Sequence, residues 1–245
     1  MKLAFIIPVC KDFNYVKLCY PLIKKHYPDS EVAIMSDGND DPGIESFCNK
    51  NNIKYFFFKH SHNNDTPGGF FRNLFYVSTF LNFDLLIKAD PDSRVLGTIE
   101  TSEMLKDKIF GTLMNSTIGR EIRYPNGKLN LIRPDFIQNG IFGIGSNVVK
   151  KIINSKYFED DKHLRERIYH YLSYGVGQPS TYALSSELLM AIACEDLNIS
   201  LHNHKDFYSI IYMKPLKLYY YDLPIDSSEA KTKMREAKFI HPIYE

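Results

Sequence analysis

The chain of 245 residues lacks the features that mark several common functional classes. Its formal net charge is only +1, so no strong attraction to nucleic acid exists, and nucleic acid is not an expected partner. Tryptophan is absent, although 17 Tyr and 17 Phe suit stacking on sugars or bases as well as ordinary core packing. Hydrophobic residues make up 44% and charged residues 24% of the chain, which argues against disorder and allows a sizeable core.

Cysteine is scarce, and long apolar runs are missing. No Cys-x-x-Cys pair and no histidine at zinc spacing accompanies the four cysteines, which are Cys10, Cys19, Cys48 and Cys194. The apolar stretch at the N-terminus is too short for a signal peptide, and no run is long enough to span a bilayer. We therefore expect reduced thiols in a cytoplasmic protein, with at most a peripheral association with a membrane.

Short apolar runs alternate with helical patterns in residues 1–90. The runs predict strands, and the apolar side chains at helical spacing between them predict helices. The strands are expected at 3–7, 31–35, 55–58 and 85–89, and the helices at 13–26, 42–50 and 70–81. This order is typical of an α/β fold with a mostly parallel, Rossmann-like central sheet, right-handed crossovers and flanking helices.

Chemically useful residues follow each predicted strand. Pro8-Val9 ends the first, Asp37 follows the second, a polar loop at 60–69 follows the third, and Asp90-Pro91-Asp92 follows the fourth. Ligands of such sheets bind beyond the carboxyl ends of the strands. We expect these four segments to meet at one rim.

The alternation loosens after residue 95. We expect a strand at 109–113, an antiparallel hairpin at 119–130, a charged helix at 161–172 and an apolar helix at 185–193 with a serine N-cap. A strand beginning at Gln138 contains glycines that are expected to allow close backbone packing, and 239–241 is expected to be a short strand. Because no repeat, low-complexity tract or linker interrupts the chain, a single domain spanning 1–245 is favoured.

The segment Asp90-Pro91-Asp92 carries the most informative chemistry. In an extended chain, positions i and i+2 project to the same side, and Pro91 stiffens the link between the two carboxylates. Two carboxylates placed in this way can hold a divalent cation, and that cation can hold phosphates. The same residues are also common in ordinary turns. The position of the pair after the fourth strand favours the metal site.

Residues 1–100 resemble the nucleotide-binding half of GT-A fold glycosyltransferases, and the remainder resembles them only loosely. Four segments carry the resemblance in the order and spacing of the family. They are the first strand Ala4–Val9, the Asp-rich turn at 36–40, the Gly-x-x-x-Arg-Asn segment ending at Arg72-Asn73, and the D-x-D motif at Asp90–Asp92. The resemblance implies that 1–100 binds a nucleotide sugar and that 101–245 holds the acceptor side and a C-terminal tail.

The resemblance further implies a metal-dependent glycosyltransferase. The donor would be a UDP- or GDP-linked sugar, the acceptor a glycan or a lipid-linked molecule, and the cofactor Mn²⁺ or Mg²⁺. The residues implied in donor binding are Pro8, Val9 and Asp37 at the base and ribose, Arg72 and Lys88 at the diphosphate or acidic pair, and Asp90 at the ribose. Arg72 also fits a surface ion pair, and Lys88 also fits a residue that only flanks the strand.

The resemblance implies that Asp92, Asp90 and a histidine from the last part of the chain bind the metal. Asp92 is the expected direct ligand, with Asp90 on the ribose or on the metal through water. His241 is favoured over His202 and His204, because 239–241 is expected to return to the site as a strand. A surface histidine is the competing interpretation of His241.

The acceptor side is assigned on the same resemblance. Glu187 fits the general base of inverting members, with Glu195-Asp196 as the weaker alternative. Glu187 also fits a residue that only favours the positive end of a helix. Gln138 and Asn139 are candidate sugar contacts, and the histidines at 60 and 62 are candidate donor or acceptor contacts.

Two other functional classes compete with this interpretation. A sugar nucleotidyltransferase would use a similar sheet and an acidic metal site, but it would open with a Gly-rich loop that residues 8–12 lack. A non-catalytic module that binds a nucleotide sugar is the third class. The presence of both Asp90 and Asp92 argues against it.

Overall fold

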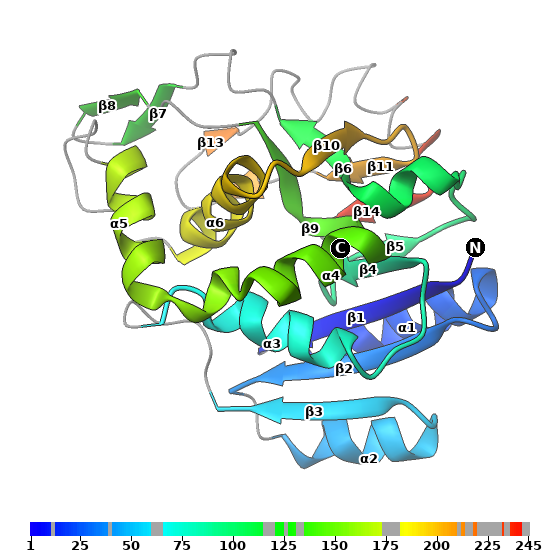
Figure 1. Ribbon diagram of the computed structural model, residues 1–245. Helices are drawn as coiled ribbons and strands as arrows, with labels where there is room; N and C mark the ends of the chain where they lie inside the picture. The colour runs from blue at the N-terminus through cyan, green and yellow to red at the C-terminus, as the bar shows by residue number, and fades with distance from the viewer. Residues whose placement is uncertain are drawn as a thin grey trace.

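A seven-stranded sheet forms the centre of the molecule in the computed structural model (Figure 1). The structure describes residues 1–10, 13–38, 41–59, 66–114, 121–124, 127–130, 135–172, 182–209, 212–213, 218–219, 232 and 236–241. The sheet has the order β10-β6-β9-β4-β1-β2-β3. Its strands are β1 Leu3–Val9, β2 Glu31–Asp37, β3 Lys54–Phe58, β4 Leu85–Ala89, β6 Lys108–Met114, β9 Phe136–Gly145 and β10 Ser200–Asn203. Only β9 runs antiparallel to its neighbours in this sheet.

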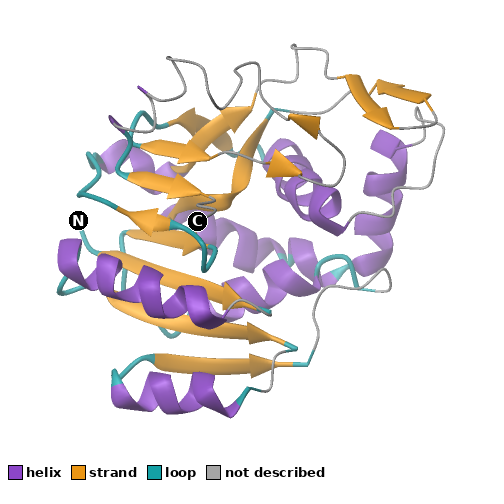
Figure 2. Cartoon of the chain, turned by 180° about the vertical axis from the view of Figure 1, so that it is seen from behind, coloured by secondary structure: helices purple, strands orange, loops and turns teal. Residues whose placement is uncertain are grey.

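Helices cover both faces of this sheet, because its strands are apolar on both sides. Helices α1 and α2 pack on one face, and α3, α4 and α6 pack on the other (Figures 1 and 2). The helices are α1 Phe13–His26, α2 Pro42–Lys50, α3 Gly69–Ser78, α4 Ser146–Ser155, α5 Asp161–Leu172 and α6 Tyr182–Asp196, with short 3-10 turns at Glu103–Asp107 and Tyr157–Glu159. Alternate residues of β1 enter the two cores: Ala4 and Ile6 on the α3 side, and Phe5 and Ile7 on the α1 side.

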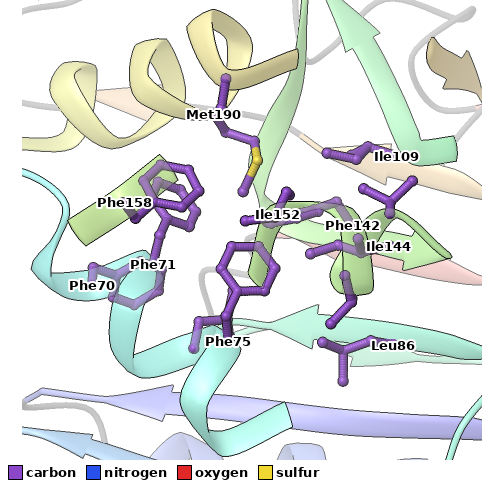
Figure 3. Packing of buried hydrophobic residues seen from close by; sticks show 14 of the residues in the cluster. Phe70, Phe71, Phe75, Leu86, Ile109, Phe142, Ile144, Ile152, Phe158 and Met190 are labelled. Carbon is purple, nitrogen blue, oxygen red and sulfur yellow. The ribbon is translucent and has the colours of Figure 1, made fainter. Parts of the chain in front are cut away.

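Aromatic rings fill the core between α3 and the strands (Figure 3). Phe75 stacks on Phe158 with ring centroids 5.7 Å apart, and Phe71 lies 4.9 Å from the same ring. Leu86 of β4 and Ile144 of β9 belong to the same cluster. This packing fixes α3 and β4, the two elements that reach the site from this side of the sheet.

A second, three-stranded sheet has the order β11-β14-β5. Its strands are β5 Arg94–Val95, β11 Phe207–Ser209 and β14 Phe239–His241. β14 pairs antiparallel with β5, with Ile240 opposite Arg94. Because β5 directly follows the acidic segment, this small sheet brings the late part of the chain back to the end of β4. Two short antiparallel pairs complete the described strands: β7 Glu121–Tyr124 with β8 Gly127–Asn130, and β12 Tyr212–Met213 with β13 Leu218–Tyr219.

The structure confirms the predicted fold class of a mostly parallel sheet flanked by helices with a smaller antiparallel element. The predicted hairpin is confirmed as β7 and β8, and the predicted packing role of the glycines is confirmed too. A Cβ on Gly143 would lie 2.1 Å from the ring of Phe110.

The start of the apolar helix was predicted wrongly, since α6 begins at Tyr182 and Ser185 lies inside it. Within the described residues, no helix is both long and apolar enough to cross a membrane.

Candidate active site

A cavity of about 340 Å³ lies at the carboxyl ends of β1, β2 and β4. Pro8, Val9 and Asp37 line it from β1 and β2. Lys88 and the segment Asp90–Asp92, Asn139 of β9 and His241 of β14 line it from the other side, with Phe70 and Cys10 completing the wall. The structure thus brings together three of the four segments expected at one rim. The fourth, at 60–69, lies mostly outside the described residues.

The acidic pair sits on a turn that is fixed at both ends. The backbone N–H of Asp90 donates to the carbonyl of Gly140 at 2.8 Å, and the N–H of Ser93 donates back to the carbonyl of Asp90 at 2.9 Å. Pro91 lies within this turn, where its fixed φ suits the bend. The turn interpretation and the metal interpretation of this segment are therefore compatible, since the turn holds both carboxylates at the cavity.

His241 reaches the same point through the second sheet. Its Nε2 lies 3.1 Å from Oδ1 of Asp92 and 3.5 Å from Oδ2 of Asp90. One ligand atom from each of the three side chains can be chosen so that all lie within 4.8 Å of one another. The other ring nitrogen, Nδ1, is buried and has no hydrogen-bond partner among the described residues. The imidazole therefore presents Nε2 to the two carboxylates.

This donor set fits a divalent cation. Two carboxylates and an imidazole suit Mn²⁺, and the carboxylates also suit Mg²⁺. Burial disfavours the charged form of Asp92, but the hydrogen bond and the charge of His241 outweigh burial and hold the pKa of this carboxyl below its usual value. Asp92 is therefore ionised at neutral pH.

The other histidines considered for this shell lie elsewhere. His204 is buried, with Nε2 2.9 Å from the carbonyl of Glu100, and its Nδ1 accepts the N–H of Asp206 at 3.3 Å. His202 packs against the ring of His204. Burial and the neighbouring His204 lower the pKa of His202. Of the three candidates, the structure brings only His241 to the acidic pair.

Arg72 does not line the cavity. Its guanidinium donates to Oδ2 of Asp161 through both terminal nitrogens at 3.2 Å, and Oδ1 of Asp161 accepts the N–H of Gly68 at 3.2 Å. Asp161 opens α5, so this ion pair joins α3 to α5. The ion pair considered for Arg72 is present, and its contact with a diphosphate stays a prediction.

The residues predicted for the acceptor side differ in whether they line the cavity. Asn139 lines the cavity, whereas Gln138 is buried and its Oε1 accepts the N–H of Gly140 at 2.7 Å. Glu187 lies in the second turn of α6, and its side chain is outside the described part of the chain, as are both histidines of the 60–69 loop. Asp196, part of the alternative base, is held by Tyr157 at 2.5 Å and by Arg167 at 2.5 Å. It therefore links α5 and α6 and does not line the cavity.

Sequence reasoning did not single out Phe70 and Gly140 as site residues. Phe70 follows the Gly68-Gly69 pair and forms part of the cavity wall. A Cβ on Gly140 would lie 1.9 Å from Nδ1 of His241, so this glycine makes the space for the imidazole. The glycines of this strand were a usable signal, but only the fold shows which side chain occupies the space.

No protein-family model and no curated protein sequence matches the chain. Solved structures do match its fold. The glycosyltransferase GlyE of Streptococcus pneumoniae TIGR4 aligns over 100% of this chain with a TM-score of 0.53 and 10% identity. This chain spans only 55% of the GlyE chain. The galactosyltransferase LgtC, in complex with donor and acceptor sugar analogs, aligns over 98% of this chain and 87% of its own, with a TM-score of 0.54 and 8% identity.

A CMP:2-keto-3-deoxy-manno-octonic acid synthetase complexed with CTP also aligns, over 83% of this chain with a TM-score of 0.45. At these identities the similarity concerns the fold alone. The chain therefore has a GT-A-like fold, in which a mostly parallel sheet flanked by helices carries the Asp90, Asp92 and His241 group beyond its strand ends.

Proposed function

We propose that this chain is a metal-dependent glycosyltransferase that moves a sugar from a UDP- or GDP-linked donor to a glycan or lipid-linked acceptor. The convergence of Asp90, Asp92 and His241 at the cavity carries the proposal. Two residues of one turn, separated by Pro91, supply the two carboxylates, whereas a strand near the other end of the sequence supplies the imidazole. The GT-A-like fold supports the same function, since glycosyltransferases share it.

The proposed reaction breaks the bond between the anomeric carbon and the diphosphate oxygen. Negative charge then develops on the leaving diphosphate. Mn²⁺ or Mg²⁺ held by Asp90, Asp92 and His241 would supply neutralisation of that charge and a template for the phosphates. In this proposal the chain itself binds the base and ribose with Pro8-Val9 and Asp37, which line the opposite wall.

On the acceptor side, the proposed base is Glu187. Its carboxylate would take the proton of the acceptor hydroxyl as the oxygen bonds to the anomeric carbon. Asn139 would contact a sugar from its place in the cavity wall, with Gln138 behind it on the same strand. A lipid-linked acceptor would bring the protein to the membrane peripherally.

Titration calorimetry with UDP-, GDP- and CMP-sugars, with and without Mn²⁺, tests this function. We expect one nucleoside diphosphate sugar to bind in the presence of Mn²⁺ and not without it, and Asp92→Ala to abolish the binding. Asp29→Ala is the matched control, because Asp29 is exposed in a turn away from the cavity. If no diphosphate nucleotide bound, or if binding ignored both Mn²⁺ and Asp92→Ala, the proposal would be wrong.

A further inference from the structure

Lys88 is a buried lysine that lines the cavity. It lies on β4, and its side chain is 2% exposed. Its ammonium is 5.8 Å from the ring centroid of Phe70 and 5.9 Å from that of Phe142. An ammonium in such surroundings is costly unless strong hydrogen bonds compensate for the lost water.

Two partners from two different strands provide that compensation. The ammonium lies 2.6 Å from Oδ1 of Asp90 and donates to the backbone carbonyl of Asn139. The N–H of Asp90 already donates to the carbonyl of Gly140. Two hydrogen bonds to neighbouring carbonyls of β9 therefore join the end of β4 to the middle of β9, and the ammonium of Lys88 donates one of them.

The two carboxylate oxygens of Asp90 have different neighbours. Oδ1 is held by Lys88, whereas Oδ2 faces Nε2 of His241 at 3.5 Å. Asp92 has no such lysine partner among the described residues, and its Oδ1 lies 3.1 Å from Nε2 of His241. The two carboxylates are therefore inequivalent before any ligand arrives.

We propose that Lys88 is a positioning residue that makes Asp90 a metal ligand through one oxygen only and fixes Asn139 in the same unit. This inference rests on the proposed function, because it concerns the same metal site. Of the two contacts expected for Lys88 from the sequence, with the diphosphate or with the acidic pair, the inference concerns the second and gives it a role: the ammonium acts through Asp90 and Asn139. Removal of groups that orient metal ligands lowers metal affinity by about 10- to 100-fold.

Calorimetric titration of the full chain with Mn²⁺ alone is the first test. Lys88→Met keeps most of the apolar stem and removes the charge, and we expect it to weaken Mn²⁺ binding by about 10- to 100-fold. Lys106→Met is the matched control, because Lys106 pairs with Asp84 at 3.0 Å outside the cavity. Equal Mn²⁺ affinity in wild type and a folded Lys88→Met would overturn the inference and leave the proposed function standing. Absence of Mn²⁺ binding in wild type would overturn the inference, whereas the nucleotide-sugar titration described above decides the proposed function.

The second test asks whether Lys88 acts through Asp90. In an Asp90→Ala background, Lys88→Met should cause little further loss of Mn²⁺ affinity, because the residue that it positions is gone. A lysine that merely supports the fold would give the same additional loss in both backgrounds, and that result would overturn the inference.

A crystal structure of the wild-type protein with Mn²⁺ keeps the inference testable if Lys88→Met fails to fold. We expect Asp90 to bind the metal through one oxygen, while Lys88 keeps its contacts with the other oxygen and with the carbonyl of Asn139. Binding of Mn²⁺ through both oxygens of Asp90, or movement of Lys88 away from Asp90, would contradict it.

Discussion

The imidazole of His241 occupies the space in which any other residue at position 140 would place its Cβ. The distance from that Cβ position to Nδ1 of His241 is 1.9 Å, which no side chain can tolerate without movement. The contact joins β9 to β14, because Gly140 lies on the first and His241 on the second. The place of the third candidate metal ligand thus depends on the absence of a side chain.

Gly140→Ala is therefore expected to displace His241 from the acidic pair. Overpacking at a buried site costs about 1 to 3 kcal/mol of unfolding free energy. We also expect Mn²⁺ affinity to fall, because Nε2 of His241 would move away from Asp92. Urea unfolding and Mn²⁺ titration measure the two effects.

Gly97→Ala is the control for this substitution. A Cβ at Gly97 would meet the side chain of Lys238 at 2.8 Å, and a flexible lysine can move aside. We expect nearly unchanged stability and Mn²⁺ affinity. If Gly140→Ala behaved in the same way, His241 would be free to shift without loss, and its role as a metal ligand would be doubtful.

The contrast between β1 and His241 shows what the sequence can predict. The run Leu3–Val9 is apolar throughout, so local pattern alone predicts a strand that is buried on both faces. The approach of His241 to Asp92 depends on pairing between β14 and β5, which are separated by most of the chain. A histidine after two apolar residues suggested a strand at 239–241, but no local pattern specifies the partner of that strand. The sequence does not predict the ion pair between Arg72 and Asp161 for the same reason, since each residue alone is typical of the exposed surface of a helix.

Arg72 is expected to have two separable roles. Its ion pair with Asp161 is partly exposed, and such pairs contribute about 1 kcal/mol or less, so Arg72→Ala and Asp161→Asn should lower stability by similar small amounts. If Arg72 also contacts the diphosphate, as the sequence predicts, Arg72→Ala alone should weaken the binding of UDP or GDP. Thermal unfolding and nucleotide titration of both variants measure the two roles. Equal nucleotide affinity in the two variants would limit Arg72 to joining α3 and α5.

Asp196 is expected to govern stability at acidic pH and not catalysis. Burial opposes its ionisation, but the hydrogen bonds from Arg167 and Tyr157 prevail, so the pKa of Asp196 lies below its usual value. A carboxyl group whose pKa is lower in the folded state stabilises the fold at pH values above its unfolded-state pKa of about 4. This contribution is lost as the pH falls through the folded-state pKa. Asp196→Asn should therefore lower stability by about 1 to 2 kcal/mol at neutral pH and flatten the loss of stability on acidification.

Urea unfolding between about pH 3 and pH 7 checks this dependence, with Asp29→Asn as the exposed control. Sugar transfer by Asp196→Asn should equal that of wild type at neutral pH, because Asp196 does not line the cavity. Loss of transfer without loss of stability would instead make Asp196 the base and displace Glu187 from that role.

Glu187→Gln is expected to lower kcat without changing the affinities for Mn²⁺ and the nucleotide. A general base contributes about 10²- to 10⁴-fold to the rate, so kcat should fall by that factor once a donor and acceptor pair is found. Affinities for Mn²⁺ and for the nucleotide should stay unchanged, because the proposed donor site lies at β1, β2 and β4. Glu166→Gln is the matched control, since Glu166 is exposed on α5 and does not line the cavity. If both variants retained wild-type kcat, Glu187 would only favour its helix, and the acceptor proton would have to leave by another route.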